Sequence, residues 1–152
     1  MRHRTLFISD VHLGTPVCKA DMLLDFRTHP PADTIYLVGD ILDAWRLRRG
    51  WFWPQSHNDV VQQLLSRAHD GARIVYIPGN HDDVLRNCLG THFGGVEVMH
   101  SAVHVTADGR RVLVTHGDSS TRSWFTANGS PMSGSAPMSL RCGSTLGRTG
   151  PS

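Results

Sequence analysis

Four short polar motifs, each placed directly after an apolar and β-branched run, constrain the fold of this chain more than any other feature. They are Asp10-Val11-His12, Gly39-Asp40, Gly79-Asn80-His81-Asp82 and His116-Gly117-Asp118. The apolar runs are typical of buried strands, so each motif is expected where a strand ends. In an α/β sheet the carboxyl ends of neighbouring strands meet at one crevice, where ligands bind. The sequence therefore predicts that residues far apart along the chain come together at one polar site.

Strands and helices are expected to alternate between these motifs. A buried strand is expected over Thr5–Ser9, and further strands over Thr34–Val38 and Arg73–Ile77. The clearest helix is expected over Gln55–His69, where apolar residues form one stripe. Smaller expected elements are a helix within Lys19–Thr28, a short helix over Asp83–Leu89, and strands over Val96–Met99, Ala102–Thr106 and Arg111–Thr115, the last two joined by a hairpin turn at Asp108-Gly109. This order predicts an α/β sandwich with a mixed or two-sheet core.

Size and composition bound the class of protein. The 152 residues predict one domain, and a hydrophobic fraction of 39% is enough for a core. A formal charge of +2 is too near neutral to indicate nucleic acid as a partner. The three cysteines are too widely spaced for a zinc site or a disulfide framework, which favours a reducing, cytosolic compartment. The N-terminus is too short and too charged for a signal peptide, and no apolar run approaches the length of a membrane span.

The composition changes at Ser119. Residues 119–152 are rich in Ser, Gly, Thr and Pro and have no sustained apolar period. Because such a segment buries too little apolar surface to offset the entropy of ordering it, we expect this tail to be mostly disordered. The expected organisation is a folded domain over residues 1–118, followed by a tail over residues 119–152.

The side chains of the four motifs are of the kinds that bind divalent metals. On an extended strand end, Asp10 and His12 project to the same side and can contact one cation. Asp40 follows a glycine that permits a sharp turn, and its carboxylate can bridge two metals. Asn80 offers an amide oxygen, and His116 an imidazole. Two metals roughly 3.5–4 Å apart bind and deprotonate water and clamp the oxygens of a phosphoryl group.

Three further motif residues are expected to support this chemistry. His81, beside the Asn80 amide, can protonate a leaving oxygen or stabilise transition-state charge. Asp82 and Asp118 can orient a ligand imidazole. Each motif alone has a plainer explanation, since Asp-x-His often occurs by chance and Gly-Asp is usually a turn. The combination of four motifs in this order, each at a strand end, favours the metal site.

These motifs resemble those of the calcineurin-like metallophosphoesterase family, whose pattern runs Asp-x-His, Gly-Asp, Gly-Asn-His-Asp/Glu, His and finally Gly-His-x-His. The resemblance covers about residues 5–118 and implies a metallophosphoesterase-type αββα sandwich of the α/β class, incomplete at the C-terminus. The chain is most similar to the branch of UDP-2,3-diacylglucosamine diphosphatases. The stretches that carry this narrower likeness are Leu6–Gly14, Leu37–Trp45 and Val112–Asp118.

The resemblance implies a role for each motif residue. Asp10 and His12 would bind a first metal, Asp40 would bridge, Asn80 and His116 would bind a second metal, and His81 would be the catalytic acid or charge stabiliser. Both ions are expected to be Mn²⁺. The implied reaction hydrolyses the pyrophosphate of a UDP-linked diacylated sugar, giving UMP and lipid X, at the cytoplasmic face of the inner membrane. A phosphodiesterase acting on another nucleotide or phospholipid is an alternative.

One departure from the family pattern is large, because the closing Gly-His-x-His is absent and no histidine follows Asp118. We therefore expect three protein ligands per metal, where the family has four, and a weaker, half-open site. The tail is interpreted as a frameshifted or foreign extension of a truncated gene. Missing last strands would expose a sheet edge, which favours aggregation. A catalytically impaired remnant that binds metal without turnover is thus a further alternative.

A basic and aromatic segment, Arg46–Trp53, lies just downstream of Asp40. Its arginines can grip a phosphate through paired hydrogen bonds. Its tryptophans can stack on a base or lie against a lipid surface. The alternative is a helix cap with solvated arginines and core-facing aromatics, and the sequence does not decide between the two. The candidate substrate-binding residues are Trp45, Arg46, Arg48 and Arg49.

Overall fold

The computed structural model describes residues 5–25 and 32–118. In this part of the chain the strands are β1 (Thr5–Ile8), β2 (Thr34–Val38), β3 (Arg73–Ile77), β4 (His92–Phe93), β5 (Val96–Val98), β6 (Ala102–Val105) and β7 (Arg111–Val114). The helices are α1 (Ala20–Leu24), α2 (Ala44–Arg49), α3 (Gln55–His69) and the 3₁₀ helix η2 (Asp83–Cys88). Five strands form one sheet in the order β1-β2-β3-β5-β4, and β6 pairs with β7 in a second sheet. All neighbours in the larger sheet run parallel except β4 and β5.

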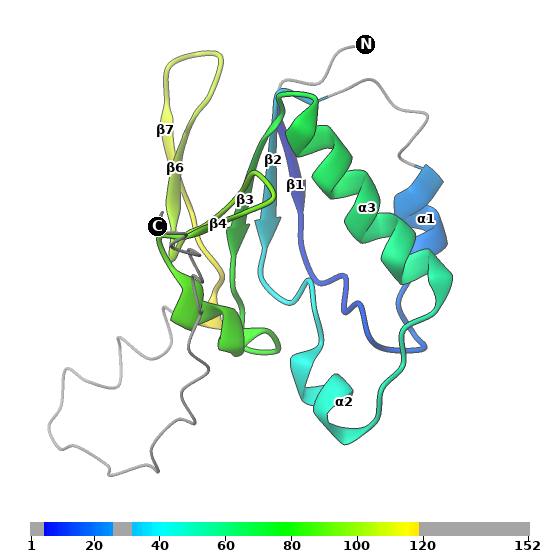
Figure 1. Ribbon diagram of the computed structural model, residues 1–152. Coiled ribbons are helices and arrows are strands. Elements are labelled where there is room, and N and C mark those ends of the chain that lie inside the picture. The colour runs from blue at the N-terminus through cyan, green and yellow to red at the C-terminus, as the bar shows by residue number, and fades with distance from the viewer. Residues whose placement is uncertain (1–4, 26–31, 119–152) are drawn as a thin grey trace, which may run out of the picture.

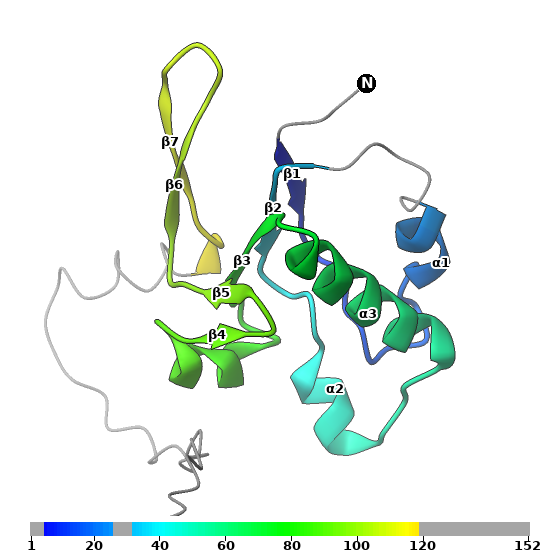
Figure 2. The ribbon, with the colours of Figure 1, turned by 45° about the horizontal axis from the view of Figure 1, so that its top comes forward.

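One face of the larger sheet packs against helices. Figures 1 and 2 show α1 and α3 together on this side, with the hairpin of β6 and β7 on the other. Residues that alternate along a strand point to opposite faces, so Ile35, Leu37 and Ile74 all face the helices. There they form a buried cluster with Val60 of α3 and with Leu13. The stripe predicted for α3 is therefore the face that covers the sheet.

The opposite face of the sheet packs against the hairpin. The alternate residues Tyr36, Val75 and Ile77 form a second buried cluster with Ala102 of β6 and Val114 of β7. The three central strand residues are each no more than 1% exposed. The sequence pattern of continuous apolar runs reflects this burial on both faces. The molecule is thus layered as helices, a parallel-dominated sheet and a small second sheet, which confirms the predicted α/β class.

Several predicted elements are observed with the predicted bounds, namely β2, β3 and α3. The predicted hairpin is also present, because β6 and β7 pair antiparallel around Asp108-Gly109, with Gly109 at φ 82°. The prediction over Asp83–Leu89 corresponds to the 3₁₀ helix η2, and that within Lys19–Thr28 to the shorter α1. Residues 26–28 and the whole tail lie outside the described residues. The disordered tail and the domain boundary at 118 therefore stay predictions.

One expectation about packing is wrong. β1 was expected to be buried, but it is the outermost strand of its sheet as described, and Phe7 is 51% exposed while its ring stacks on Tyr36. An edge strand lacks a neighbour on one side, so its residues cannot be enclosed on every side. His57 of α3 is buried as well, at 2% exposed. The helix α2 and the strand β4 were not among the predicted elements.

Candidate metal centre

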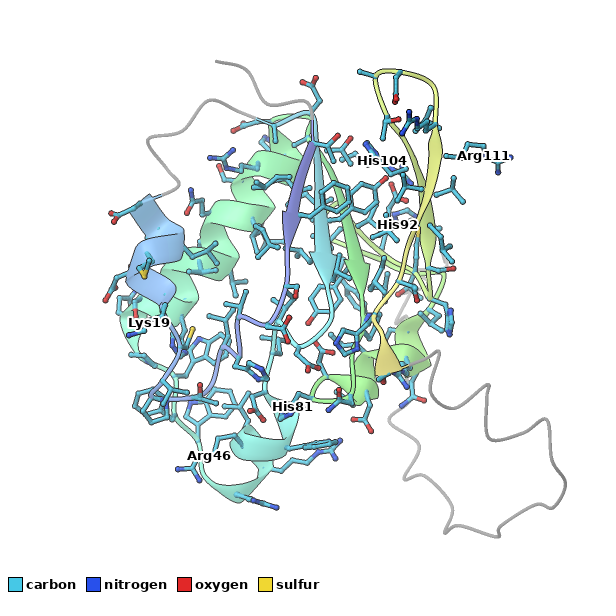
Figure 3. The ribbon with its side chains drawn as sticks, turned by 180° about the vertical axis from the view of Figure 1, so that it is seen from behind. Lys19, Arg46, His81, His92, His104 and Arg111 are labelled. Atoms are coloured by element: carbon cyan, nitrogen blue, oxygen red, sulfur yellow. The ribbon has the colours of Figure 1, made fainter. Side chains whose placement is uncertain are left out.

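The loops after β1, β2, β3 and β7 converge beyond the carboxyl ends of the strands. The loop after β1 lies along the loop after β2, since the amide of His12 donates to the Asp40 carbonyl at 2.9 Å and that of Leu13 to the Ile41 carbonyl at 2.8 Å. Figure 3 shows His81 at this end of the sheet, near α2 and Arg46, whereas His104 lies on the hairpin, in β6. The predicted convergence of distant motifs is therefore present in the fold.

Three of the predicted ligands adopt a backbone conformation that is unusual for their residue type. Asp10, His12 and Asp40 have φ angles of 55°, 54° and 55°. Side chains other than glycine are uncommon in this left-handed region, and such strain clusters at functional sites. The expectation of an extended strand end at Asp10-Val11-His12 is wrong, because the chain turns at both polar residues. The side-by-side projection of Asp10 and His12 therefore has no support from an extended backbone and stays a prediction.

The site contains two groups of metal-binding atoms, each with three residues. Within each group the candidate ligand atoms all lie within 4.8 Å of one another. The first group is Asp10, Asp40 and His116, and the second is His12, Asp43 and His81. Asp10 and His12 thus stand in different groups. Five of the predicted site residues are in these groups. The sixth member, Asp43, had no predicted role.

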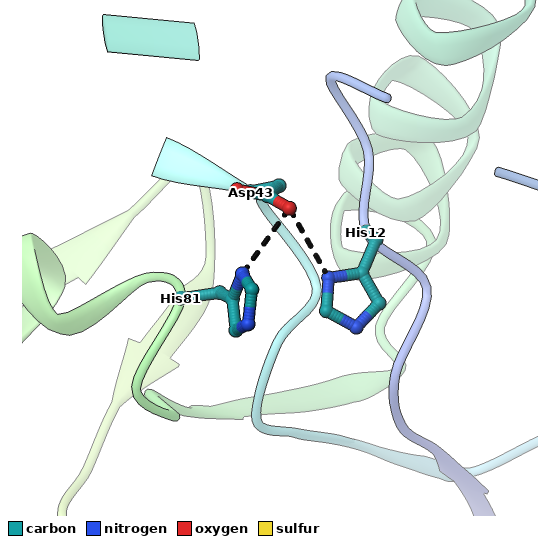
Figure 4. Close-up of side chains that lie close together, drawn as sticks. All are labelled: His12, Asp43 and His81. Atoms are coloured by element: carbon teal, nitrogen blue, oxygen red, sulfur yellow. Dashed lines mark ion pairs between the residues drawn. The ribbon is translucent and has the colours of Figure 1, made fainter. Parts of the chain in front are cut away.

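Asp43 connects the two imidazoles of the second group. Its Oδ2 lies 3.1 Å from His81 Nδ1 and 3.5 Å from His12 Nδ1 (Figure 4). Its Oδ1 accepts from the Arg46 amide at 2.8 Å and so caps the N-terminus of α2. Burial raises the pKa of this carboxyl, but the hydrogen bond from the Arg46 amide and the nearby His81 outweigh it, so the pKa lies below its ordinary value. An aspartate three residues after Gly39-Asp40 and directly before a helix was the signal that could have identified it.

His81 is held by rings as well as by Asp43. The Trp45 ring lies 4.5 Å from the His81 ring, with the planes tilted by 32°, and the His12 ring meets it edge-on at 4.7 Å. Nδ1 of His81 is buried and makes no hydrogen bond of good geometry despite its closeness to Asp43. The neighbouring rings therefore restrict the His81 ring, while its Nδ1 has no hydrogen-bond partner among the described residues.

His116 is positioned by a glycine and by Asp118. A Cβ at Gly39, where φ is 67°, would lie 2.0 Å from His116 Cδ2, so only glycine permits this approach. Nδ1 of His116 lies 2.9 Å from Asp118 Oδ1, and its Nε2 lies 3.8 Å from Asp40 Oδ2. Asp118 also pairs with Arg86. Burial raises the pKa of Asp118, but these two partners outweigh it, so the pKa lies below its ordinary value.

Asp82 is fully buried and ties two loops together. Its Oδ2 accepts from the amides of Ile41 and Leu42, at 3.0 and 3.3 Å, and from the Tyr76 hydroxyl at 2.5 Å. Its Oδ1 accepts from the Gly79 amide at 2.6 Å. The role predicted for Asp82, orienting a ligand imidazole, stays a prediction. The hydrogen bonds show that its carboxylate joins the loop after β2 to the loop after β3.

The remaining predicted residues are placed more loosely. Both chain neighbours of Asn80 lie against Asp40. A Cβ added at Gly79 would come within 2.3 Å of Asp40 Oδ1, and the His81 amide donates to the same oxygen at 2.9 Å. Asn80 therefore stands at the edge of the first group. The candidate substrate-binding residues all lie on α2, and Trp45 contacts His81 while the arginine side chains are exposed.

The residues present fit divalent cations. Two carboxylates, those of Asp10 and Asp40, are held together with the His116 imidazole, and both aspartates have strained backbones. Like charges at this separation disfavour each other unless a cation lies between them. Carboxylate and imidazole are also the ligand types that Mn²⁺, Zn²⁺ and Fe accept. The residues and the geometry thus define a candidate metal centre at the carboxyl end of a parallel sheet.

Comparison with known proteins agrees with this architecture. Residues 3–137 match the calcineurin-like phosphoesterase family, and the chain belongs to that family. It is 33% identical over 118 residues to a UDP-2,3-diacylglucosamine hydrolase of Stenotrophomonas maltophilia, covering 75% of this chain and 46% of that protein. Its identity to the Aeromonas hydrophila protein of the same name is 31% over 120 residues, covering 75% of this chain and 47% of the relative. The chain spans about half the length of the curated relatives it matches. In the described part of the chain, no helix is long and apolar enough to cross a membrane.

Proposed function

We propose that this chain forms the metal-binding part of a hydrolase that cleaves the phosphoanhydride of UDP-2,3-diacylglucosamine, giving UMP and lipid X. The observation that carries the proposal is the convergence of motif side chains into two adjacent groups of metal ligands. Support for the substrate comes from the relatives named UDP-2,3-diacylglucosamine hydrolase. Membership of the phosphoesterase family supports hydrolysis at phosphorus.

The proposed cofactors are two divalent cations, with Mn²⁺ the first choice. Asp10 and His12 would hold one ion, Asn80 and His116 the other, and Asp40 would bridge them. When bound, such a pair supplies a nucleophile from water at neutral pH and neutralises charge on the phosphoryl oxygens. Because Asp10 and His12 stand in different groups, sharing one ion would draw these two side chains together.

The proton chemistry is assigned to His81. Asp43 lies at its Nδ1, so Nε2 is the nitrogen left to deliver a proton to the leaving oxygen. Trp45 packs on the ring and restricts its rotation. The exposed arginines of α2 stand at the same end of the sheet and are proposed to bind the substrate phosphates (Figure 3). Their charge and the 76% exposed Trp51 also suit the surface of an anionic inner membrane facing the cytoplasm.

A second candidate function is that of a metal-binding remnant without turnover. It is favoured by the two groups of candidate ligands, each of which holds three of the described residues. Three protein ligands per ion would hold metal more weakly and would leave the site half open.

Activity and metal binding together separate the two candidates. The purified chain is assayed with Mn²⁺ on bis-(p-nitrophenyl) phosphate and on UDP-2,3-diacylglucosamine, with Asp40→Ala as the control. The hydrolase requires turnover that the Asp40→Ala variant lacks. Mn²⁺ binding without turnover supports the remnant. If the chain neither turns over substrate nor binds Mn²⁺, both candidates are wrong.

A further inference from the structure

Arg86 belongs to none of the four sequence motifs, yet one residue, Asp118, connects it to the candidate ligand His116. It lies on η2, directly after Gly79-Asn80-His81-Asp82. Its guanidinium pairs with Asp118 Oδ2, while the other oxygen of that carboxylate lies 2.9 Å from His116 Nδ1. Arg86, Asp118 and His116 are 28%, 20% and 16% exposed as side chains, so the three groups are largely shielded from water. An ion pair in such surroundings constrains geometry more than a fully exposed one does.

The contacts at Asp118 decide which nitrogen of His116 carries the proton. An ionised carboxylate can only accept hydrogen bonds, so it selects the tautomer with hydrogen on Nδ1. Nε2 then keeps its lone pair and faces Asp40 at 3.8 Å. The pair with Arg86 engages the other oxygen of Asp118 and so restricts the rotation of this carboxylate. Gly39 confines the opposite side of the ring, at the close approach described above.

We propose that Arg86 is a positioning residue for the candidate metal centre: by holding Asp118, it fixes the tautomer and orientation of His116 so that Nε2 faces Asp40 and would be available to an ion. This inference rests on the proposed function for the presence of the ion. The part concerning the tautomer stands on the metal-free geometry alone. Groups that orient a ligand imidazole typically change metal affinity by 10- to 100-fold when they are lost.

The test compares the full chain with Arg86→Met, which removes the charge and keeps the length, and Arg86→Lys, which restores a charge. Arg110→Met is the matched control, because Arg110 also pairs with an aspartate, Asp108, but in the hairpin turn. In metal-free protein, long-range ¹H–¹⁵N spectra of the histidine rings report the tautomer of His116. Calorimetric titration with Mn²⁺ then measures each binding step, and urea unfolding verifies that every variant is folded.

For the wild type and Arg110→Met we expect the Nδ1–H tautomer and the same Mn²⁺ affinities. For Arg86→Met we expect a mixture of tautomers and one binding step weakened roughly 10- to 100-fold, with partial recovery in Arg86→Lys. An unchanged tautomer together with unchanged affinities in Arg86→Met overturns the inference. If the wild type binds no Mn²⁺, the proposed function fails, while the tautomer comparison still decides the role of Arg86. Should Arg86→Met not fold, Arg86→Lys carries the same comparison, with a smaller expected change.

Discussion

Removing the carboxylate of Asp82 is the sharpest test of how the fold holds the metal-binding loops. This side chain is fully buried and accepts four hydrogen bonds, three from backbone amides and one from the Tyr76 hydroxyl. The amides belong to two different loops, one after β2 and one after β3. Each loop carries predicted metal ligands, so the loss of this carboxylate should affect both stability and metal binding.

The size of the effect follows from the donors that are left without an acceptor. A buried donor without a partner costs about 1–3 kcal/mol, so four donors at the lower end predict a loss of about 4 kcal/mol for Asp82→Ala. Asp82→Asn keeps an acceptor at the Oδ2 position but places an amino group opposite the Gly79 amide, which predicts about 2 kcal/mol. Tyr76→Phe removes one donor and predicts about 1.5 kcal/mol. Because Tyr76 and Asp82 are in contact, the double variant should cost less than the sum.

Urea unfolding followed by tryptophan fluorescence measures these differences, in a chelating buffer so that bound metal does not add to stability. Asp83→Asn is the matched control, since it changes the same residue type at the next position, where the side chain is exposed. The expected order of stability loss is Asp82→Ala, then Asp82→Asn, then Tyr76→Phe, then Asp83→Asn. A loss for Asp82→Ala within about 0.5 kcal/mol of the control, the usual range of surface substitutions, would refute the reasoning.

Three further outcomes are expected. Asp43→Asn retains the helix cap but not the charge opposite His81, so turnover should fall roughly 10- to 100-fold, measured as kcat on bis-(p-nitrophenyl) phosphate, with urea stability close to wild type. Gly39→Ala places a methyl group against the His116 ring, so calorimetry should show at least one Mn²⁺ step weakened by about 10-fold or more. Burial lowers the pKa of His57 below 6.5, so the unfolded chain binds more protons and the unfolding free energy should fall as the pH drops below about 6.5. His57→Asn lacks this titrating group, so its urea midpoint should change less between pH 7.5 and 5.5 than that of the wild type.

The sequence was most informative where local pattern and burial agree. The bounds of β2, β3 and α3 were predicted correctly, because each is an apolar run or stripe whose residues enter one of the two buried clusters. The convergence of the motifs was also predictable, since parallel strands bring their carboxyl ends to one edge. The division of the motif residues into two groups of candidate ligands was not predictable from the sequence. It depends on left-handed φ angles at Asp10, His12 and Asp40, and no residue pattern signals that conformation at aspartate or histidine.

Other features were missed because their cause is tertiary. The helix α2 has only six residues, too few for a periodic pattern, and it is recognisable mainly from its cap at Asp43. His57 is buried because the Gly14 amide donates to its Nδ1 at 3.1 Å and because Phe52 and Trp53 pack edge-on against its ring. Arg86 reaches Asp118 across 32 residues of sequence, a contact that spacing does not reveal.

The two groups of ligands are supported by different parts of the fold. His12, Asp43 and His81 follow strands of the five-stranded sheet, whereas His116 follows β7 of the hairpin. A two-stranded hairpin is marginally stable by itself, and this one is held through Ala102 and Val114 on its inner face. Its outer face is exposed at Val103, Val105 and Leu113.

Local opening of the hairpin would therefore withdraw His116 from Asp10 and Asp40 without unfolding the sheet, since regions of a protein open with different free energies. By linkage, an ion held by His116 and Asp40 would stabilise the docked hairpin, by an amount that grows with the concentration of free ion relative to its dissociation constant. Metal affinity at His116 is thus inseparable from how well the hairpin is packed, and the contact between Arg86 and Asp118 acts on both.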